Sequence, residues 1–188
     1  MTEQLNEGQQ RIVDILQKTH IHFCTPCYGG QILEGCFSSY LRFSILATKY
    51  GIPFSVDTLI NESLVSRARN SLVAKFLANP NATHLMFVDA DITFTPDDIL
   101  RLVLHQKSIV CGAYPMKTTP IKYVMNIIED AAHEDPLYEV NTSGTGFMLI
   151  KREVIENMIE KMPELKYKDS VGLGEQYEPY MYALFDTM

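Results

Sequence analysis

The sequence has no apolar run of about 18 residues, the length that a membrane-spanning helix requires. Its first ten residues, MTEQLNEGQQ, contain no basic stretch followed by an apolar one, so they do not resemble a signal peptide. Four cysteines in 188 residues are too few for a disulfide-rich scaffold. Basic residues number 16 against 23 acidic ones, and the formal net charge of −7 argues against a broad nucleic-acid surface. These absences predict a cytoplasmic chain in a reduced compartment, without a membrane span or a nucleic-acid partner.

The order of the expected elements predicts an α/β fold. The composition, 46% hydrophobic and 21% charged, is that of a single domain with a core. Strands are expected at 21–25, 54–60, 84–88 and 108–113, and helices at 3–19, 32–50, 63–77 and 95–106. This alternation favours a mainly parallel sheet with right-handed crossovers, flanked by helices. After Pro115 we expect strands at 123–128, 138–141 and 147–150 and a helix at 153–162, as a smaller mixed part.

A pair of carboxylates follows the expected strand 84–88. That strand is apolar throughout Leu85-Met86-Phe87-Val88, which indicates burial on both of its faces. Asp89 and Asp91 come directly after it, and ligands of open parallel sheets bind beyond the carboxyl ends of strands. Residues i and i+2 of an extended chain point the same way, so both carboxylates are expected to face one ion. Two hard oxygen ligands with room for phosphate oxygens predict Mg²⁺ or Mn²⁺. The alternative is a solvated turn without a ligand.

Three kinds of site use an Asp-x-Asp pair. A calcium-binding EF-hand loop is excluded, because Phe94 and Leu100 stand where it needs glycine and glutamate. The segment from Phe87 to Thr93 also resembles the first motif of haloacid-dehalogenase-like phosphatases, with Asp89 as nucleophile and Asp91 as general acid. Two strand–helix units precede it here, and no later apolar strand ends in an acidic pair. The phosphatase therefore stays an alternative to the third kind of site, which the next motifs indicate.

The sequence from about residue 21 to 150 resembles small GT-A glycosyltransferases of phages, large DNA viruses and bacteria. The shared features are, in order, a first strand ending in Thr25-Pro26, an Arg-x-Arg-Asn helix, Phe-Val-Asp-x-Asp, Gly-x-Tyr-Pro-x-Lys and Gly-Thr-Gly-Phe-Met-Leu-Ile. The resemblance implies a Rossmann-like GT-A fold over 1–188, with a nucleotide-binding half at 1–115 and an acceptor-side part at 116–188. It also implies a bacterial or virus-infected cell as the setting.

The same resemblance implies a metal-dependent transfer from a nucleotide-diphosphate sugar, of uridine type, to a sugar, glycan, lipid or protein acceptor. Asp89 and Asp91 would hold Mn²⁺ or Mg²⁺, which acts as the Lewis acid on the diphosphate. Only one of two arginines on the helix 63–77 can turn toward this pair, since both cannot point the same way. The implied donor-binding residues are Thr25, Pro26, Asn61, Glu62, Arg67, Arg69, Asn70, Asp89, Ala90, Lys117, Gly144 and Thr145.

The resemblance leaves the catalytic base unassigned. Members of the family tend to continue with an acidic segment that supplies this base, and we expect the sequence, which ends at Met188, to stop before that segment. Glu175, Glu178 and Asp186 are the late acids that remain as candidates. A non-catalytic module that binds a nucleotide sugar is therefore a further alternative.

A redox function is a competing alternative, because Cys24 and Cys27 form a Cys-x-x-Cys motif after the first strand. In thioredoxin-like proteins the motif opens a helix directly, whereas Tyr28-Gly29-Gly30 intervenes here. No second Cys or His pair has the spacing of a zinc site. The sequence favours buried cysteines that pack as small apolar residues.

Overall fold

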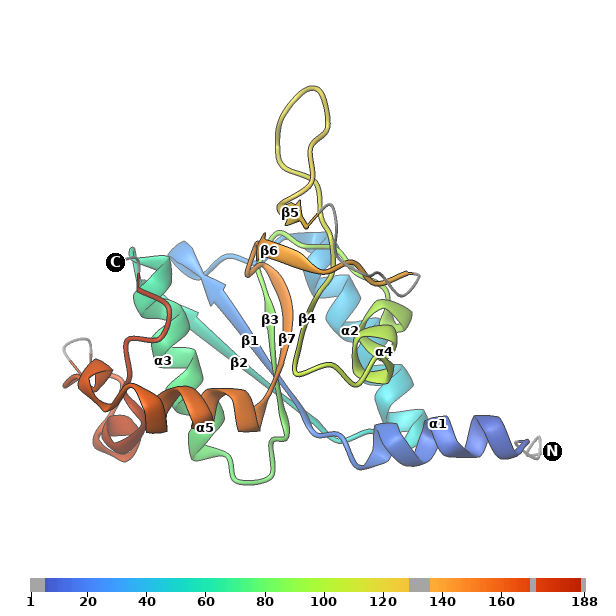
Figure 1. The fold of residues 1–188 in the computed structure, drawn as a ribbon, viewed down its shortest axis with the longest axis horizontal. Coiled ribbons are helices and arrows are strands. Elements are labelled where there is room, and N and C mark those ends of the chain that lie inside the picture. The colour runs from blue at the N-terminus through green and yellow to red at the C-terminus, as the bar shows by residue number, and fades with distance from the viewer. Residues whose placement is uncertain (1–5, 129–135, 170–171, 187–188) are drawn as a thin grey trace.

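The computed structural model describes residues 6–128, 136–169 and 172–186, so the first residues of the helix expected over 3–19 lie outside it. A central sheet lies between layers of helices (Figure 1). The strands are β1 (Ile21–Cys27), β2 (Phe54–Ile60), β3 (His84–Val88), β4 (Ile109–Cys111), β5 (Met125–Ile127), β6 (Val140–Ser143) and β7 (Phe147–Lys151). The helices are α1 (Glu7–Gln17), α2 (Glu34–Tyr50), α3 (Val65–Ala78), α4 (Pro96–Leu104) and α5 (Arg152–Lys161), with 3₁₀ turns η1 (Tyr28–Gly30), η2 (Pro163–Leu165) and η3 (Glu175–Tyr180).

The five-stranded sheet has the order β2-β1-β3-β7-β4. β1 is parallel to β2 and β3, while β7 is antiparallel to both β3 and β4. All its strands except β7 therefore run in one direction, and the expected mainly parallel, Rossmann-like α/β fold is confirmed. β5 and β6 form a separate two-stranded antiparallel sheet.

The position of β7 corrects one expectation. The strand 147–150 was expected in a mixed part that follows the parallel sheet, but β7 lies inside that sheet and separates β3 from β4. Its side chains suit this place, because Phe147 and Leu149 join the core on one face and Ile150 joins the core on the other. A strand with apolar residues on both faces is stable only when helices cover both of its sides.

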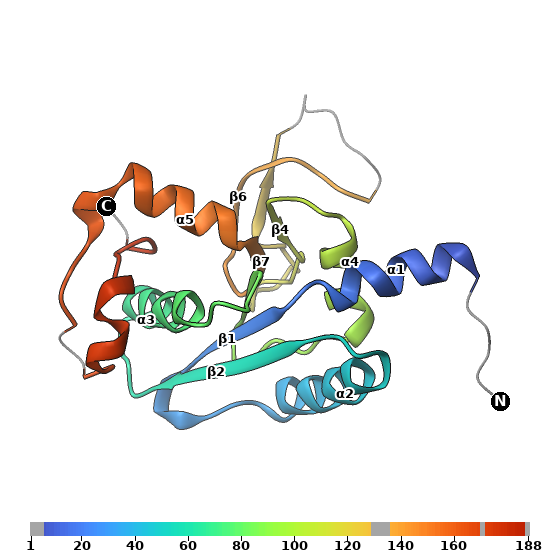
Figure 2. The same cartoon turned by 90° about the horizontal axis from the view of Figure 1, so that it is seen from below.

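The helices cover both faces of the sheet (Figure 2). α2 and α4 pack on one face over Met86 and Val88 of β3, and α3 and α5 pack on the other over Leu85 and Phe87. β3 is thus buried on both sides, as its apolar sequence predicts. Of the helices in the described part of the chain, none is long and apolar enough to cross a membrane.

β1 continues through Pro26 to Cys27, two residues beyond its expected end. Proline has no N–H group to give to a sheet, so it is tolerated where a strand lacks a partner on one side. β1 pairs with β3 only from Ile21 to Cys24, which leaves Pro26 without a strand on that side. The last residues of β1 therefore extend beyond its pairing with β3, at the edge of the sheet where β1, β2 and β3 have their carboxyl ends.

Arg152 fastens the end of α3 to the start of α5. Its guanidinium donates to the carbonyls of Asn79 (2.6 Å), Ala82 (2.7 Å) and Phe76 (3.1 Å) and lies over the Phe76 ring. We expect Arg152→Ala to lower the free energy of unfolding by about 2–3 kcal/mol, because these carbonyls would lose a charged donor. Arg101→Ala on α4 is the matched control, and urea denaturation measures both. Equal midpoints for the two variants would contradict this role.

Candidate functional site

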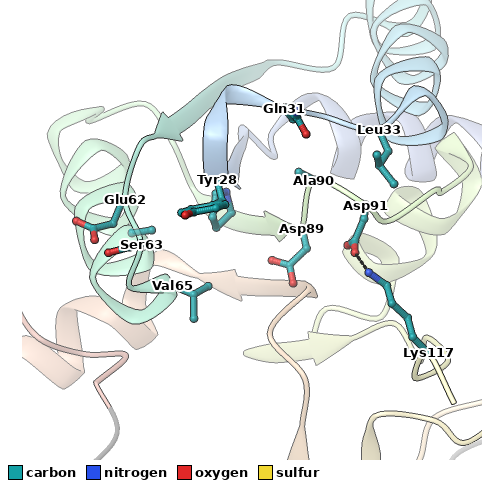
Figure 3. Close-up of a pocket in the computed structure, with 12 residues that line it drawn as sticks. Tyr28, Gln31, Leu33, Glu62, Ser63, Val65, Asp89, Ala90, Asp91 and Lys117 are labelled. Atoms are coloured by element: carbon teal, nitrogen blue, oxygen red, sulfur yellow. Dashed lines mark hydrogen bonds and ion pairs between the residues drawn. The ribbon is translucent and has the colours of Figure 1, made fainter.

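A pocket of about 440 Å³ opens at the carboxyl ends of β1, β2 and β3 (Figure 3). This volume is in the range of small-ligand sites. One wall is formed by the end of β1 and the segment after it, and consists of Pro26, Tyr28, Gln31 and Leu33. A second follows β2 into α3 and consists of Glu62, Ser63, Val65 and Ala68. The third consists of Asp89, Ala90 and Asp91 after β3, together with Lys117.

Asp89 is held from three directions. Its N–H donates to the carbonyl of Gly146 (2.8 Å), which prolongs the pairing of β3 with β7. Arg69 on α3 donates from Nη2 to Oδ1 of Asp89 (2.6 Å). A Cβ atom added at Gly146 would stand 2.7 Å from Oδ2 of Asp89, closer than real Cβ contacts. The position of this carboxylate therefore depends on a strand, a helix and a glycine.

Asp91 belongs to a turn, which corrects the extended conformation expected for the pair. The N–H of Ile92 donates to the carbonyl of Asp89 (3.0 Å), so the chain reverses there. Ala90 in turn accepts the N–H of Leu33 (2.9 Å), which ties the turn to the start of α2. Both carboxylates still line the same pocket, and Lys117 donates to Oδ2 of Asp91 (2.5 Å) (Figure 3).

Charges of both signs converge on the pair. Burial raises the pKa of Asp89, the nearby Arg69 guanidinium opposes that rise, and the charge of Asp91 adds to it. The Asp91 carboxylate raises the pKa of the Lys117 ammonium. Each aspartate therefore has one basic side chain as its partner.

The donor chemistry of the pair fits a divalent cation. Within the described residues, no group of three or more His, Cys, Asp or Glu side chains is placed to hold a metal. Asp89 and Asp91 would be the protein ligands, and the other positions would fall to water and to the oxygens of a bound phosphate. Mg²⁺ is commonly held this way, by one or two carboxylates and the substrate's phosphates.

Two helices begin at the pocket with an apolar residue at the N-cap position, and just before α3 the Glu62 carboxylate accepts the N–H of Leu64 (2.9 Å). Leu33 precedes α2 and Leu64 precedes α3, and neither residue makes a capping hydrogen bond with its side chain. Leu33 and Val65 line the pocket, so the first turns of both helices face it. The first N–H groups of a helix lack intrahelical partners and carry the positive end of its dipole. Such ends favour anions, phosphate among them.

Of the Thr25-Pro26 pair, only Pro26 lines the pocket. Thr25 is fully buried, and its Oγ1 lies 2.6 Å from the hydroxyl of Tyr40 on α2. Successive residues of a strand point to opposite faces, which explains why the two differ. Thr25 thus supports the end of β1 from beneath the pocket wall.

The arginines of α3 have different partners. Arg67 makes a two-pronged contact with Glu62, from Nε to Oε2 (2.6 Å) and from Nη2 to Oε1 (2.8 Å), and this contact lowers the pKa of Glu62. Arg69 is the arginine that reaches the aspartate pair. Asn61, with a φ of 60°, forms the exposed turn before Glu62. The side chain of Asn70 is buried and turns toward the C-terminal segment rather than into the pocket.

Gly144 and Thr145 form the turn between β6 and β7 and lie outside the pocket lining. A Cβ atom at Gly144 would overlap the hydroxyl oxygen of Tyr114, and that hydroxyl accepts the N–H of Gly146 (3.1 Å). The glycines therefore admit a side chain of this protein, Tyr114, which braces the turn behind Asp89.

None of the three candidate bases lines the pocket. Glu175 and Glu178 belong to η3, which packs along α3 (Figure 1). Asp186 accepts a hydrogen bond from Asn70 Nδ2 (2.9 Å), and the Phe185 N–H donates to Oδ1 of Asn70 (2.9 Å). Asn70 thus fastens the C-terminal segment to α3.

The cysteines are free, and Cys24, Cys27 and Cys36 are buried. Burial raises the pKa of the Cys24 thiol well above its usual value and that of Cys36 to about 12. A reactive cysteine needs a lowered pKa. These side chains pack as small apolar groups, as the sequence favours.

The sequence did not single out several lining residues, notably Tyr28, Gln31, Leu33, Ser63 and Val65. For two of these residues, the sequence position indicates a place at the pocket. Tyr28 directly follows the end of β1, and Leu33 precedes a helix although it cannot cap one.

No protein-family model matches the sequence, and no curated protein is significantly similar to it. Solved structures do resemble the fold. One is A197 from STIV, at 22% identity and a TM-score of 0.49, covering 86% of this chain and 77% of that one. Another is 4-diphosphocytidyl-2C-methyl-D-erythritol synthase from Anaerococcus prevotii, at 14% identity and a TM-score of 0.46, covering 85% of this chain and 83% of that one.

Replacing Arg69 tests the electrostatics of the site. Arg69→Met removes the cation that opposes the rise in the pKa of Asp89, so we expect that pKa to increase further. Arg67→Met, two positions away, is the matched control and should leave the pKa of Asp89 unchanged, because Arg67 is bonded to Glu62. Carbon-detected NMR titration of labelled aspartate measures both. An equal titration of Asp89 in the two variants would disprove the assignment.

Proposed function

We propose that this chain is a metal-dependent glycosyltransferase that binds a nucleotide-diphosphate sugar, of uridine type, at the pocket beside Asp89 and Asp91. The observation that carries the proposal is the meeting of this carboxylate pair with the starts of two helices in one pocket at the ends of parallel strands, where neither N-cap residue has a capping side chain. Negative side chains alone would repel a diphosphate. Together with helix N-termini and a cation they form a site for one.

Each wall has a role in this proposal. The exposed ring of Tyr28 and the Pro26 ring offer apolar surface to the base and ribose at the end of β1. The first turns of α2 and α3 face the diphosphate. Asp89 and Asp91 would hold Mn²⁺ or Mg²⁺, which supplies charge neutralisation for the diphosphate as the sugar leaves.

Lys117 has two partners in this scheme. Without a ligand it neutralises Asp91. Its side chain is 88% exposed, so it can leave that carboxylate at little cost and turn to a phosphate oxygen. Arg69, which is buried, stays with Asp89 and fixes its orientation.

The pocket residues support donor binding, whereas none of the candidate bases Glu175, Glu178 and Asp186 lines the pocket. A non-catalytic module would bind the donor without transfer, so an assay of sugar transfer to acceptors separates it from an enzyme. A phosphatase would instead release phosphate from a monoester and lose this activity in Asp89→Asn.

Calorimetry with UDP and GDP, each with and without Mn²⁺, tests donor binding. We expect UDP to bind in the presence of Mn²⁺, and Asp91→Ala to weaken that affinity at least about tenfold, since one of two protein ligands is lost. Asp97→Ala is the matched control, because Asp97 is an exposed acid in the first turn of α4. The proposal fails if neither nucleotide binds, if Mn²⁺ makes no difference, or if Asp91→Ala binds like Asp97→Ala.

Lys117→Ala tests the exchange of partners. Removing the lysine frees Asp91, so Mn²⁺ alone should bind a few-fold more tightly. UDP in the presence of Mn²⁺ should bind more weakly, because a phosphate contact is lost. Lys122→Ala, from the same loop, is the control for both titrations. If Lys117→Ala changed the affinities for Mn²⁺ and for UDP in the same direction, Lys117 would not exchange Asp91 for a phosphate oxygen.

A further inference from the structure

A finger formed by residues 115–123 projects beyond the sheet, above β5 (Figure 1), and its Lys117 lines the pocket. Its two sides are joined by hydrogen bonds from Met116 N–H to the Lys122 carbonyl (2.6 Å) and from Val124 N–H to the Tyr114 carbonyl (3.1 Å). Pro115 and Tyr123 form a bridge at its base. The finger is therefore a formed hairpin-like element.

The finger presents apolar side chains to solvent. Ile121 is 71% exposed, Tyr123 53% and Met116 42%. Each of these apolar side chains is unfavourably exposed to water, and exposed apolar surface on a projecting element commonly serves as a contact site. Their contact with an apolar phase would remove that cost.

The charge of the finger is opposite to that of the chain. No Asp or Glu occurs from Ile99 to Ile128, although the chain has 23 acidic residues and a net charge of −7. The finger carries Lys117 and Lys122, both exposed, and acidic residues resume only at Glu129. Exposed apolar side chains and two lysines thus lie on either side of the Thr118-Thr119-Pro120 turn, and this combination on an acidic protein is complementary to a surface that is anionic outside and apolar beneath.

We propose that this finger docks on an anionic lipid bilayer. Ile121 and Met116 enter the boundary between headgroups and acyl chains, Tyr123 lies at the interface with its hydroxyl toward water, and Lys122 binds lipid phosphate. A protein partner is less favoured, because a stable protein interface needs about 800 Å² on each side and the finger is narrow.

Docking of the finger also determines where the pocket lies relative to the lipid surface. Lys117 belongs to both the finger and the pocket lining, so a docked finger brings the pocket mouth to the lipid surface. If the proposed function holds, on which this step rests, the acceptor is a lipid-borne hydroxyl at headgroup depth. The docking itself does not require that function.

Co-sedimentation of the full chain with vesicles tests the docking. We expect wild type to bind vesicles of phosphatidylcholine mixed with phosphatidylglycerol, and to bind vesicles of phosphatidylcholine alone much less. Ile121→Asp should abolish the binding, and Lys122→Ala should weaken it about fivefold, the contribution of one lysine near an anionic surface. Ile45→Asp is the matched control, because Ile45 is 72% exposed but lies on α2.

Equal sedimentation of Ile121→Asp and wild type would overturn the proposal, as would equal binding to the two kinds of vesicle or an equal loss in Ile45→Asp. UDP calorimetry on the same proteins keeps the two proposals apart. Retained UDP affinity in Ile121→Asp, together with lost vesicle binding, supports a docking role for the finger. Vesicle binding by a wild-type protein that binds no nucleotide would refute the proposed function and leave the docking standing.

Discussion

The contact between Arg69 and Asp89 is the interaction on which the pocket depends. The guanidinium side chain is only 7% exposed, lies over the Phe87 ring, and has Asp89 as its ionic partner at 2.6 Å. Nε of Arg69 is buried without a hydrogen-bond partner among the described residues. A buried charge that loses its partner is strongly destabilising. The pair therefore links α3 to the end of β3. Moving the Asp89 carboxylate away would leave the buried Arg69 charge without its partner, which would destabilise the fold.

The pocket gathers residues that are distant in sequence, and each is placed by a different element. β1 carries Pro26 past the end of its pairing with β3, and the turn after β3 is tied to the start of α2 through Ala90 and Leu33. Gly146 of the β6–β7 turn accepts the Asp89 N–H from the other side. The site thus depends on the whole sheet rather than on one motif.

Local patterns predicted much of this fold. The bounds of β2 and β3 agree with the expected 54–60 and 84–88, because each is a compact apolar or alternating run. α4 begins with Thr95 as its N-cap and Pro96 at its first position, as the helix-start residues indicate. These signals lie within a few residues of the feature that they specify.

Long-range placement was not predictable in the same way. The strand pattern of 147–150 indicates burial but not its neighbours, and β7 lies between β3 and β4. Helix spacing shows that Arg67 and Arg69 cannot both face the aspartates. It does not show which one does: in the structure Arg67 binds Glu62, and Arg69 binds Asp89. The contact of Lys117 with Asp91 depends on the path of the finger. Each of these outcomes is decided by tertiary packing.

The insertion of β7 has a consequence for synthesis of the chain. β3 and β4 emerge from the ribosome well before residues 147–151, and until then their facing edges have unpaired N–H and C=O groups. Open edges of apolar strands are sites of aggregation, and contacts between distant segments form slowly. A nascent chain that has been translated only as far as β4 cannot complete this sheet, so it is the state most exposed to misassembly and to capture by chaperones.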